Sequence, residues 1–327
     1  MNYLLPKYLL PILLYLHGSC NTTQQGSTDP PALNFSPSAT EDDISCKYQI
    51  ASVEPEWSLE LDAQINETSG LIHWDGVLWT HNDDTDTRLY LLDPATAENV
   101  GNYDLPGVIN QDWEEIAQDD DFIYVGDFGN NRGDRENLHI LRADKTSLKS
   151  GQPSIDTIWF TYSDQQSLVS TGPYQTEFDC EAFIVSSDSI YLFSKQWLSG
   201  NTTLYVLPKL PGSHMARKRE SFFVQGQVTG ATWLEEERLL VLCGHTGLIQ
   251  PFFYLFFDYF GNDFFSGDHM RVNLNLPFHQ VEAVHTLDGL QYYITNEHFM
   301  LDSYLEIPQK LHKIDLIEQL GAYLNGR

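Results

Sequence analysis

The sequence is poor in positive charge and has no long hydrophobic run. Only 18 of its 327 residues are Lys or Arg, against 46 Asp or Glu, so the formal net charge is -28. Such an acidic chain repels phosphate backbones and anionic lipid surfaces, and we therefore expect no direct binding to nucleic acid. The many carboxylates of this chain instead favour divalent cations as partners, because such ions prefer hard oxygen ligands. With 42% hydrophobic and 13% aromatic residues, the chain can still bury a core, which excludes general disorder.

Cysteine is also scarce. Beyond Cys20, the chain has only Cys46, Cys180 and Cys243, an odd number that excludes a disulfide framework but allows one pair. No Cys and His residues have zinc-site spacing, so a bound metal would take oxygen ligands. A Ser-His-Asp order, a Walker loop, a dinucleotide fingerprint and HExxH are absent too, and these chemistries have no support.

The N-terminus has the pattern of an export signal. Its apolar stretch, residues 8–16, is about half of the ~20 residues that span a bilayer. The Leu-His-Gly-Ser-Cys end resembles a bacterial lipoprotein signal, so we expect residues 1–20 to be the signal and Cys20 the lipid-anchored residue; an ordinary cleaved signal is the alternative. Residues 21–46, rich in Ser, Thr, Gln and Pro, are predicted to be a flexible linker. These features predict an exported protein of the bacterial cell envelope or surface.

Beyond residue 46 a short motif occurs five times. Its copies are Ser69-Gly70-Leu71, Glu114-Glu115-Ile116, Glu181-Ala182-Phe183, Thr229-Gly230-Ala231 and Glu282-Ala283-Val284. Each copy is followed by a β-rich run, at residues 77–80, 122–126, 190–194, 239–243 and 292–295, and then by another, at residues 89–93, 138–142, 204–208, 253–257 and 311–315. This period predicts a repeat architecture with one sheet per copy.

Fourth strands are predicted at residues 156–162, 221–225 and 270–274, with a weaker one near 101–105. The last repeat has none, because the tail after it has a helical pattern. Residues 57–61 can supply that strand, as in propellers whose ring is closed by an N-terminal strand. The sequence therefore predicts an all-β fold, a five-bladed β-propeller over residues 47–327. A six-bladed ring is the alternative, which would place two blades in the longest step between motifs.

The first strand of each propeller blade lines the central channel, so the first residues of the five motifs should share one axis. These are Ser69, Glu114, Glu181, Thr229 and Glu282. Three carboxylates a few Å apart repel one another by about 4 kcal/mol per pair at ~4 Å, and either protons or a cation must neutralise them. We predict that they hold Ca2+, which takes six to eight oxygen ligands. A water-filled channel with partly protonated glutamates is the alternative.

The loops after the second strands should open on the same face and carry polar side chains. We expect the ligand-binding residues there to be Asn82, Asn130, Arg132, Lys195, Trp197 and Asn296. The candidate general bases are Glu115, Asp83 and Asp127. Arg132 and Lys195 are two cations in an acidic rim, an arrangement that suits a small anionic or polar ligand held through the metal.

These motifs resemble those of the calcium-activated nucleotidases, or apyrases. The resemblance rests on the Ser, Glu, Glu, Thr, Glu order of the ring, on Glu-Thr-Ser-Gly-Leu at 67–71 and on Tyr-Val-Gly-Asp-Phe-Gly at 124–129. It implies a five-bladed propeller with one axial calcium, and nucleotide hydrolysis. Thr229 and Lys195 stand where that family has Ser and Arg. The chain is also similar to uncharacterised exported propeller proteins of Bacteroidetes-type bacteria, through phrases such as GDFGNNRGDR.

Three functions remain open, and whether the chain is an enzyme is undecided. The first is calcium-dependent hydrolysis of a phosphoanhydride or phosphoester. The second is non-catalytic binding of a carbohydrate or peptide, with Trp113 and Trp197 as stacking platforms. The third is glycoside hydrolysis, which Ser69 disfavours because the first blade then lacks its carboxylate. We expect a monomer whose membrane contact is confined to the lipid anchor.

Overall fold

The computed structural model describes residues 23–325, which divide into two compact units, one ending at Cys46 and one beginning at Lys47. The predicted signal and Cys20 lie outside the described residues. In the first unit, expected to be a linker, the described residues bond among themselves. The Thr28 hydroxyl donates to Asp42 at 2.7 Å, and the Ser27 Oγ lies 3.0 Å from the Cys46 Sγ.

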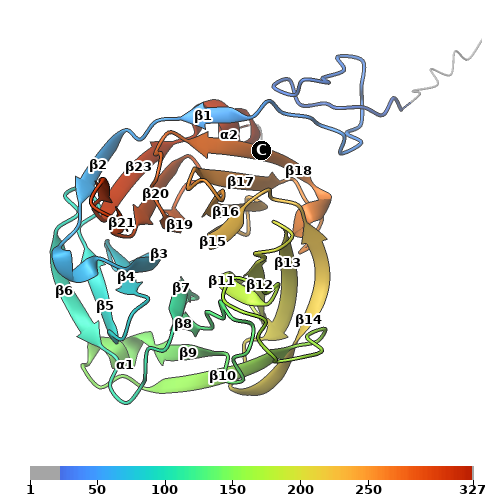
Figure 1. Cartoon of the computed structure of the whole chain (residues 1–327). Coiled ribbons are helices and arrows are strands. Elements are labelled where there is room, and N and C mark those ends of the chain that lie inside the picture. Colours follow the sequence, from blue (N-terminus) through green and yellow to red (C-terminus); the bar gives the residue numbers. More distant parts are fainter. Residues whose placement is uncertain (1–22, 326–327) are drawn as a thin grey trace, which may run out of the picture. The chain divides into compact units, whose positions relative to one another are not determined.

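The second unit is an all-β propeller, as predicted (Figure 1). Its strands fall into five sets of four, each antiparallel throughout. The first set is β3 (Thr68–Trp74), β4 (Val77–Asn82), β5 (Arg88–Leu92) and β6 (Asn99–Asp104); the second is β7 (Trp113–Gln118), β8 (Phe122–Asp127), β9 (His139–Asp144) and β10 (Ile155–Tyr162); the third is β11 (Asp179–Val185), β12 (Ser189–Lys195), β13 (Thr202–Pro208) and β14 (Gly212–Phe222). The fourth is β15 (Gln227–Leu234), β16 (Leu239–His245), β17 (Pro251–Phe257) and β18 (Asp268–Leu274), and the fifth is β19 (Val281–Thr286), β20 (Gln291–Asn296), β23 (Lys310–Asp315) and β2 (Trp57–Glu60).

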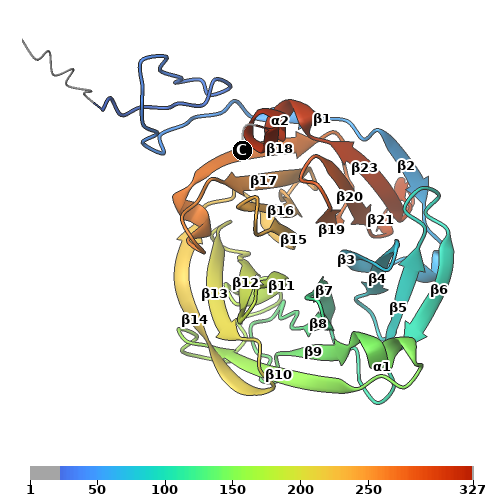
Figure 2. The same ribbon diagram turned by 180° about the vertical axis from the view of Figure 1, so that it is seen from behind.

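The N-terminal strand β2 closes the ring, because it pairs antiparallel with β23 from Trp57 opposite Lys313 to Glu60 opposite Lys310. Both views show the first strands of the five sets nearest the centre and the fourth strands outermost (Figures 1 and 2). The predicted helical tail forms α2 (Ile317–Asn325), and a short helix α1 (Lys145–Lys149) follows β9. Two additions were not predicted: β1 (Ala51–Val53), which pairs parallel with β18, and the hairpin of β21 (Phe299–Leu301) and β22 (Leu305–Ile307).

One predicted strand is placed wrongly. The fourth strand of the third set was expected at residues 221–225, but β14 runs from Gly212 to Phe222. Its first half is exposed and polar, so it lacks the apolar alternation that marks a half-buried strand. This half pairs in parallel with β10, from Ile158 opposite Gly212 to Tyr162 opposite Ala216, and so joins the second and third sets into one eight-stranded sheet.

Buried aromatic and aliphatic side chains between neighbouring sets hold the first strands in place. Phe128, Phe183, Leu192 and Tyr205, for example, pack in one cluster between the second and third sets. The β-rich run predicted at residues 253–257 lies within β17, which is largely buried. Within residues 23–325, no helix is both long enough and apolar enough to cross a membrane.

Candidate metal centre

Each first strand contains an irregularity at its motif. In β7, β11, β15 and β19 the pairing with the next strand skips one residue, and that residue is Glu114, Glu181, Thr229 or Glu282. In β3 the register shifts between Ser69 and Ile72. Bulges of this kind leave a residue unpaired and redirect its side chain, and they are common next to functional sites. The five motif residues, called the axial ring below, therefore all lie at a pairing irregularity; four are the unpaired residue, whereas Ser69 pairs with His81 and borders the irregularity.

The three glutamates of the axial ring are buried, with side chains of Glu114 and Glu181 close enough to hydrogen-bond. The two hydroxyls tie neighbouring blades together. The Ser69 Oγ donates to the Glu114 backbone oxygen at 2.6 Å, and the Thr229 Oγ1 donates to the Val281 backbone oxygen at 2.6 Å. The ring thus combines inter-blade hydrogen bonds with three carboxyl groups in a buried space.

A lysine lies among these carboxyl groups. The Nζ of Lys195, the last residue of β12, is 3.1 Å from Glu181 Oε1 and 4.8 Å from the centre of the Trp197 ring. Burial alone would lower the pKa of Lys195, but Glu181 and Glu282 raise it above its ordinary value. Lys195 is therefore a fixed cation within the acidic site. The indole of Trp197 donates to Asp179 Oδ2 at 2.7 Å and lies against the ring of Tyr174, whereas Trp113 is fully buried and cannot offer a stacking surface.

Three further carboxylates converge beside the ring. One oxygen each of Glu67, Asp83 and Glu297 lies within 4.8 Å of the others. Within residues 23–325, the three ring glutamates do not form such a set. We call Glu67, Asp83 and Glu297 the acidic triad; only Asp83 among them was predicted as a site residue.

A sequence signal for the missed acids exists. In every repeat the residue two positions before the ring residue is polar, and in the first three it is acidic. These residues are Glu67, Asp112, Asp179, Gln227 and Gln280. Alternate positions of a strand share a face, so acids placed two before the ring residues belong to the same end of the channel. Glu297 was missed because it follows β20 in a loop, at the place that Asp83 occupies after β4.

The carboxyl groups of this end have raised pKa values. Burial, reinforced by Glu67 and other acids, raises the pKa of Asp83 to about 8. Burial likewise raises the pKa of Glu282 to about 8 and that of Asp112 to about 6, in both cases with Glu181 adding to the shift. The pKa of Glu297 is well above its ordinary value, through burial and then Glu282. Folding removes these carboxyl groups from water and brings them close enough to repel one another. The positive charge of Lys195 offsets this repulsion only in part.

The candidate general bases differ in their surroundings. Glu115 is fully buried; its Oε1 accepts from the Ile116 N–H at 3.0 Å and its Oε2 from the Ala231 N–H at 2.8 Å. Asp127 is also buried, and its Oδ1 pairs with the Arg135 guanidinium at 2.6 Å. Asp83 is half-buried, and no side chain within residues 23–325 donates a hydrogen bond to its carboxylate. Of the three, Asp83 is the one whose carboxylate faces the other acids of the site.

The asparagines expected to bind ligand donate hydrogen bonds from their side-chain amides to backbone oxygens of the protein. Asn82 donates to the Gln64 backbone oxygen at 2.8 Å, Asn130 to Phe178 at 2.9 Å, and Asn296 to Pro308 at 3.0 Å. Arg132 is mostly exposed and lies 3.5 Å from Asp134.

Arg135 is a cation that sequence reasoning missed. Its guanidinium pairs with Asp127 and donates to the Gly129 backbone oxygen at 2.7 Å, and its charge lowers the pKa of Asp112 against the effect of burial.

The donor set fits a hard divalent cation. Carboxylates are the ligands that Ca2+ prefers, and the acidic triad supplies three of them, from the first and fifth blades, with no thiol or imidazole in the set. A cation bound here would relieve the repulsion that raises the pKa values of these acids. The arrangement can therefore hold a metal ion, and the ammonium of Lys195, paired with Glu181, lies beside it.

Comparison with known protein families gives no match, and comparison with curated proteins gives none. Several solved structures are distantly similar. One, described as the structure of U3-55K, has a TM-score of 0.37 and 9% identity, over 76% of this chain and 68% of that one. A mitotic checkpoint complex has a TM-score of 0.34 and 10% identity over 75% and 63%, and a computationally designed Ika8 protein has 0.31 and 10% over 76% and 71%. Likeness at this level indicates nothing about function, and none of the three is named as a nucleotidase.

Proposed function

We propose that this propeller holds Ca2+ at its acidic end and binds a small anionic ligand through the ion. The observation that carries the proposal is the convergence of the acidic triad, Glu67, Asp83 and Glu297, beside the buried glutamates of the axial ring. So many carboxyl groups in one buried place cost stability unless protons or a cation neutralise them. Phosphoanhydrides and phosphoesters are the ligand class that the resemblance to apyrases favours.

In this proposal, different residues of the protein would have different chemical roles. The acidic triad and Glu114, Glu181 and Glu282 would ligate the ion, which when bound polarises an anionic oxygen. Lys195 would stabilise negative charge on the ligand, because its ammonium is buried and held by Glu181. If hydrolysis follows, the Asp83 oxygen that does not ligate the ion would accept a proton from water, since Glu115 and Asp127 are already held by backbone N–H groups and by Arg135.

We also propose that the protein is exported and anchored to the bacterial envelope through Cys20. Support comes from the sequence alone, in the lipoprotein-like end of residues 1–20 and the low-complexity segment that follows. Metabolic labelling with a fatty-acid analogue tests it, because a Cys20→Ala variant should lose the label.

Calorimetric titration with Ca2+ tests the metal centre. We expect one site in the wild type, and binding at least tenfold weaker in Glu297→Gln and in Glu181→Gln. Glu236→Gln is the matched control, since Glu236 is exposed and should leave the affinity unchanged. Absence of a calcium isotherm, or equal affinity in all variants, would refute the site.

The anion-binding step has its own test. With Ca2+ present, nucleoside diphosphates and triphosphates and a simple phosphoester are titrated, and free phosphate is measured. Calcium-dependent binding with phosphate release supports hydrolysis, and binding without release supports the non-catalytic reading. No binding of any of these anions would refute an anion site while leaving the calcium titration standing.

A further inference from the structure

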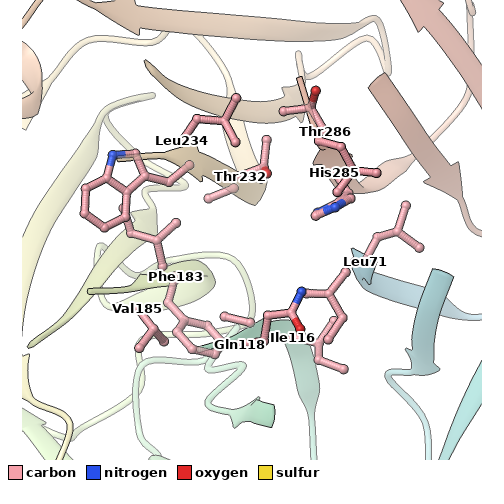
Figure 3. A pocket seen from close by; sticks show the side chains of 15 residues that line it. Leu71, Ile116, Gln118, Phe183, Val185, Thr232, Leu234, His285 and Thr286 are labelled. Carbon is pink, nitrogen blue, oxygen red and sulfur yellow. The ribbon is translucent and has the colours of Figure 1, made fainter. Parts of the chain in front are cut away.

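A separate cavity of about 220 Å³ lies along the channel on the other side of the axial ring (Figure 3). All five first strands contribute to its wall, at positions that follow the ring residues in the chain. Leu71, Ile116, Phe183, Leu234 and His285 each represent one of these strands. The acidic triad instead comes from residues that precede the first strands or follow the second strands. The cavity and the metal centre therefore belong to opposite ends of the first strands.

Packed atoms lie between the two sites. The carboxylate of Glu115 accepts backbone N–H groups from Ile116 and from Ala231, which belong to the second and fourth blades. The first and second blades are in direct contact at the same level, because a Cβ on Gly70 would lie 2.6 Å from the Ile116 nitrogen. The cavity is thus not the floor of the metal centre.

The lining of this cavity contains no charged residue, although 20% of the chain is Asp, Glu, Lys or Arg. Leucine, isoleucine, valine, phenylalanine and alanine side chains supply most of it, and Gln118 is engaged because its amide donates to the His73 backbone oxygen at 2.7 Å. Burial lowers the pKa of His285 to about 3, so its imidazole is neutral at pH 7. A charged ligand would find no counter-ion here and would lose its hydration, which disfavours it strongly.

One polar atom is left over. The buried Nε2 of His285 has no hydrogen-bond partner within residues 23–325, and Figure 3 shows the imidazole ring directed into the cavity. Buried polar atoms are nearly always paired, so an unpaired nitrogen next to the cavity is consistent with a ligand that supplies its partner.

We propose that this cavity binds a small neutral molecule with an apolar body, about the size of one substituted aromatic ring. An enclosed cavity of about 150 Å³ lined by Leu, Ile and Phe is known to bind benzene. The cavity here is larger, opens to the surface, and has polar groups beside its apolar side chains. A hydroxyl on the ligand, which can donate or accept, would suit either tautomer of His285. This site does not depend on the proposed function, because it shares no residue with the metal centre.

Saturation-transfer NMR and calorimetry with p-cresol test the proposal, with benzoate as a charged probe of similar size. We expect p-cresol to bind at least tenfold more tightly than benzoate, equally in Ca2+ and in EDTA. Ala231→Leu and Val185→Phe, which fill the cavity, should each weaken p-cresol binding at least tenfold, whereas Ala95→Leu on the exposed surface should not. Melting curves show which variants fold, and having two filling variants keeps the test valid if one does not. No saturation transfer to p-cresol, equal binding of benzoate, or unchanged affinity in a folded filling variant would overturn the proposal.

Discussion

Replacing Asp83 by Asn should stabilise the protein in the absence of calcium and at the same time weaken its response to calcium. The pKa of Asp83 is raised to about 8 in the folded protein from an ordinary 3.8, first by burial and then by Glu67. A carboxyl group shifted upwards in this way supports folding fully below pH 4, and that support is lost as the pH rises towards 8. About three pH units separate the ordinary pKa of 3.8 from pH 7. At ~1.4 kcal/mol per unit, the folded protein therefore loses about 4 kcal/mol of stability through Asp83 at pH 7.

Asparagine has no proton to take up, so Asp83→Asn should recover that free energy in EDTA at pH 7. For a propeller of this size, about 4 kcal/mol corresponds to a rise in the melting temperature of about 8 °C. Calcium at a hundred times its dissociation constant would stabilise the wild type by ~2.7 kcal/mol, and this gain should be largely lost in the variant.

Differential scanning calorimetry in EDTA and in Ca2+, from pH 5 to pH 8, measures both effects. The matched control is Glu236→Gln, because Glu236 is exposed and does not contribute to the pKa shift of Asp83, so it should change neither value. A melting temperature of Asp83→Asn in EDTA equal to that of the wild type, or an undiminished calcium shift, would show that Asp83 does not face a buried acidic cluster.

Three further predictions concern stability and can be checked by chemical denaturation. Lys195→Met should lower the free energy of unfolding in EDTA by about 3–5 kcal/mol, since it leaves Glu181 buried without its partner, and calcium should restore more stability to it than to the wild type. Glu115→Ala should cost about 3 kcal/mol because it leaves the Ile116 and Ala231 N–H groups unpaired, whereas Glu115→Gln, which keeps an acceptor, should cost less. Thr229→Val should lose about 1 kcal/mol with the hydrogen bond to Val281, and an unchanged stability would count against that inter-blade bond.

The blades could be predicted from the sequence because each contains the same three elements in the same order. The ring motif, the β-rich run that follows it and the next run recur five times, and a closing strand at residues 57–61 was implied by the missing strand of the last repeat. β14 was placed wrongly because its first part, from Gly212 to Ala216, pairs with β10 through backbone groups while most of its side chains face water. Pairing of that kind leaves no hydrophobic pattern in the sequence.

The acidic residues of the candidate metal centre could be predicted from the sequence only in part, for a related reason. A period identifies which residues are equivalent, and this brought Ser69, Glu114, Glu181, Thr229 and Glu282 together. The period does not indicate which loop side chains make hydrogen bonds within the protein. Asn82, Asn130 and Asn296 read as ligand-binding residues, yet their amides bond to backbone oxygens that hold the loops. Asparagine is common in loops for that purpose.

The two ends of the channel differ in chemistry because the residue type changes along the first strands of the five blades. At the ring and before it the strands carry acids, and two residues further on they carry Leu71, Ile116 and Phe183. Carboxyl groups in a narrow space need compensation, and Lys195 supplies one positive charge where six or more acids converge. A bound metal ion would add positive charge and neutralise more of these acids. The apolar end needs no such compensation, which is why a chain with a net charge of -28 can still offer a neutral molecule an uncharged cavity.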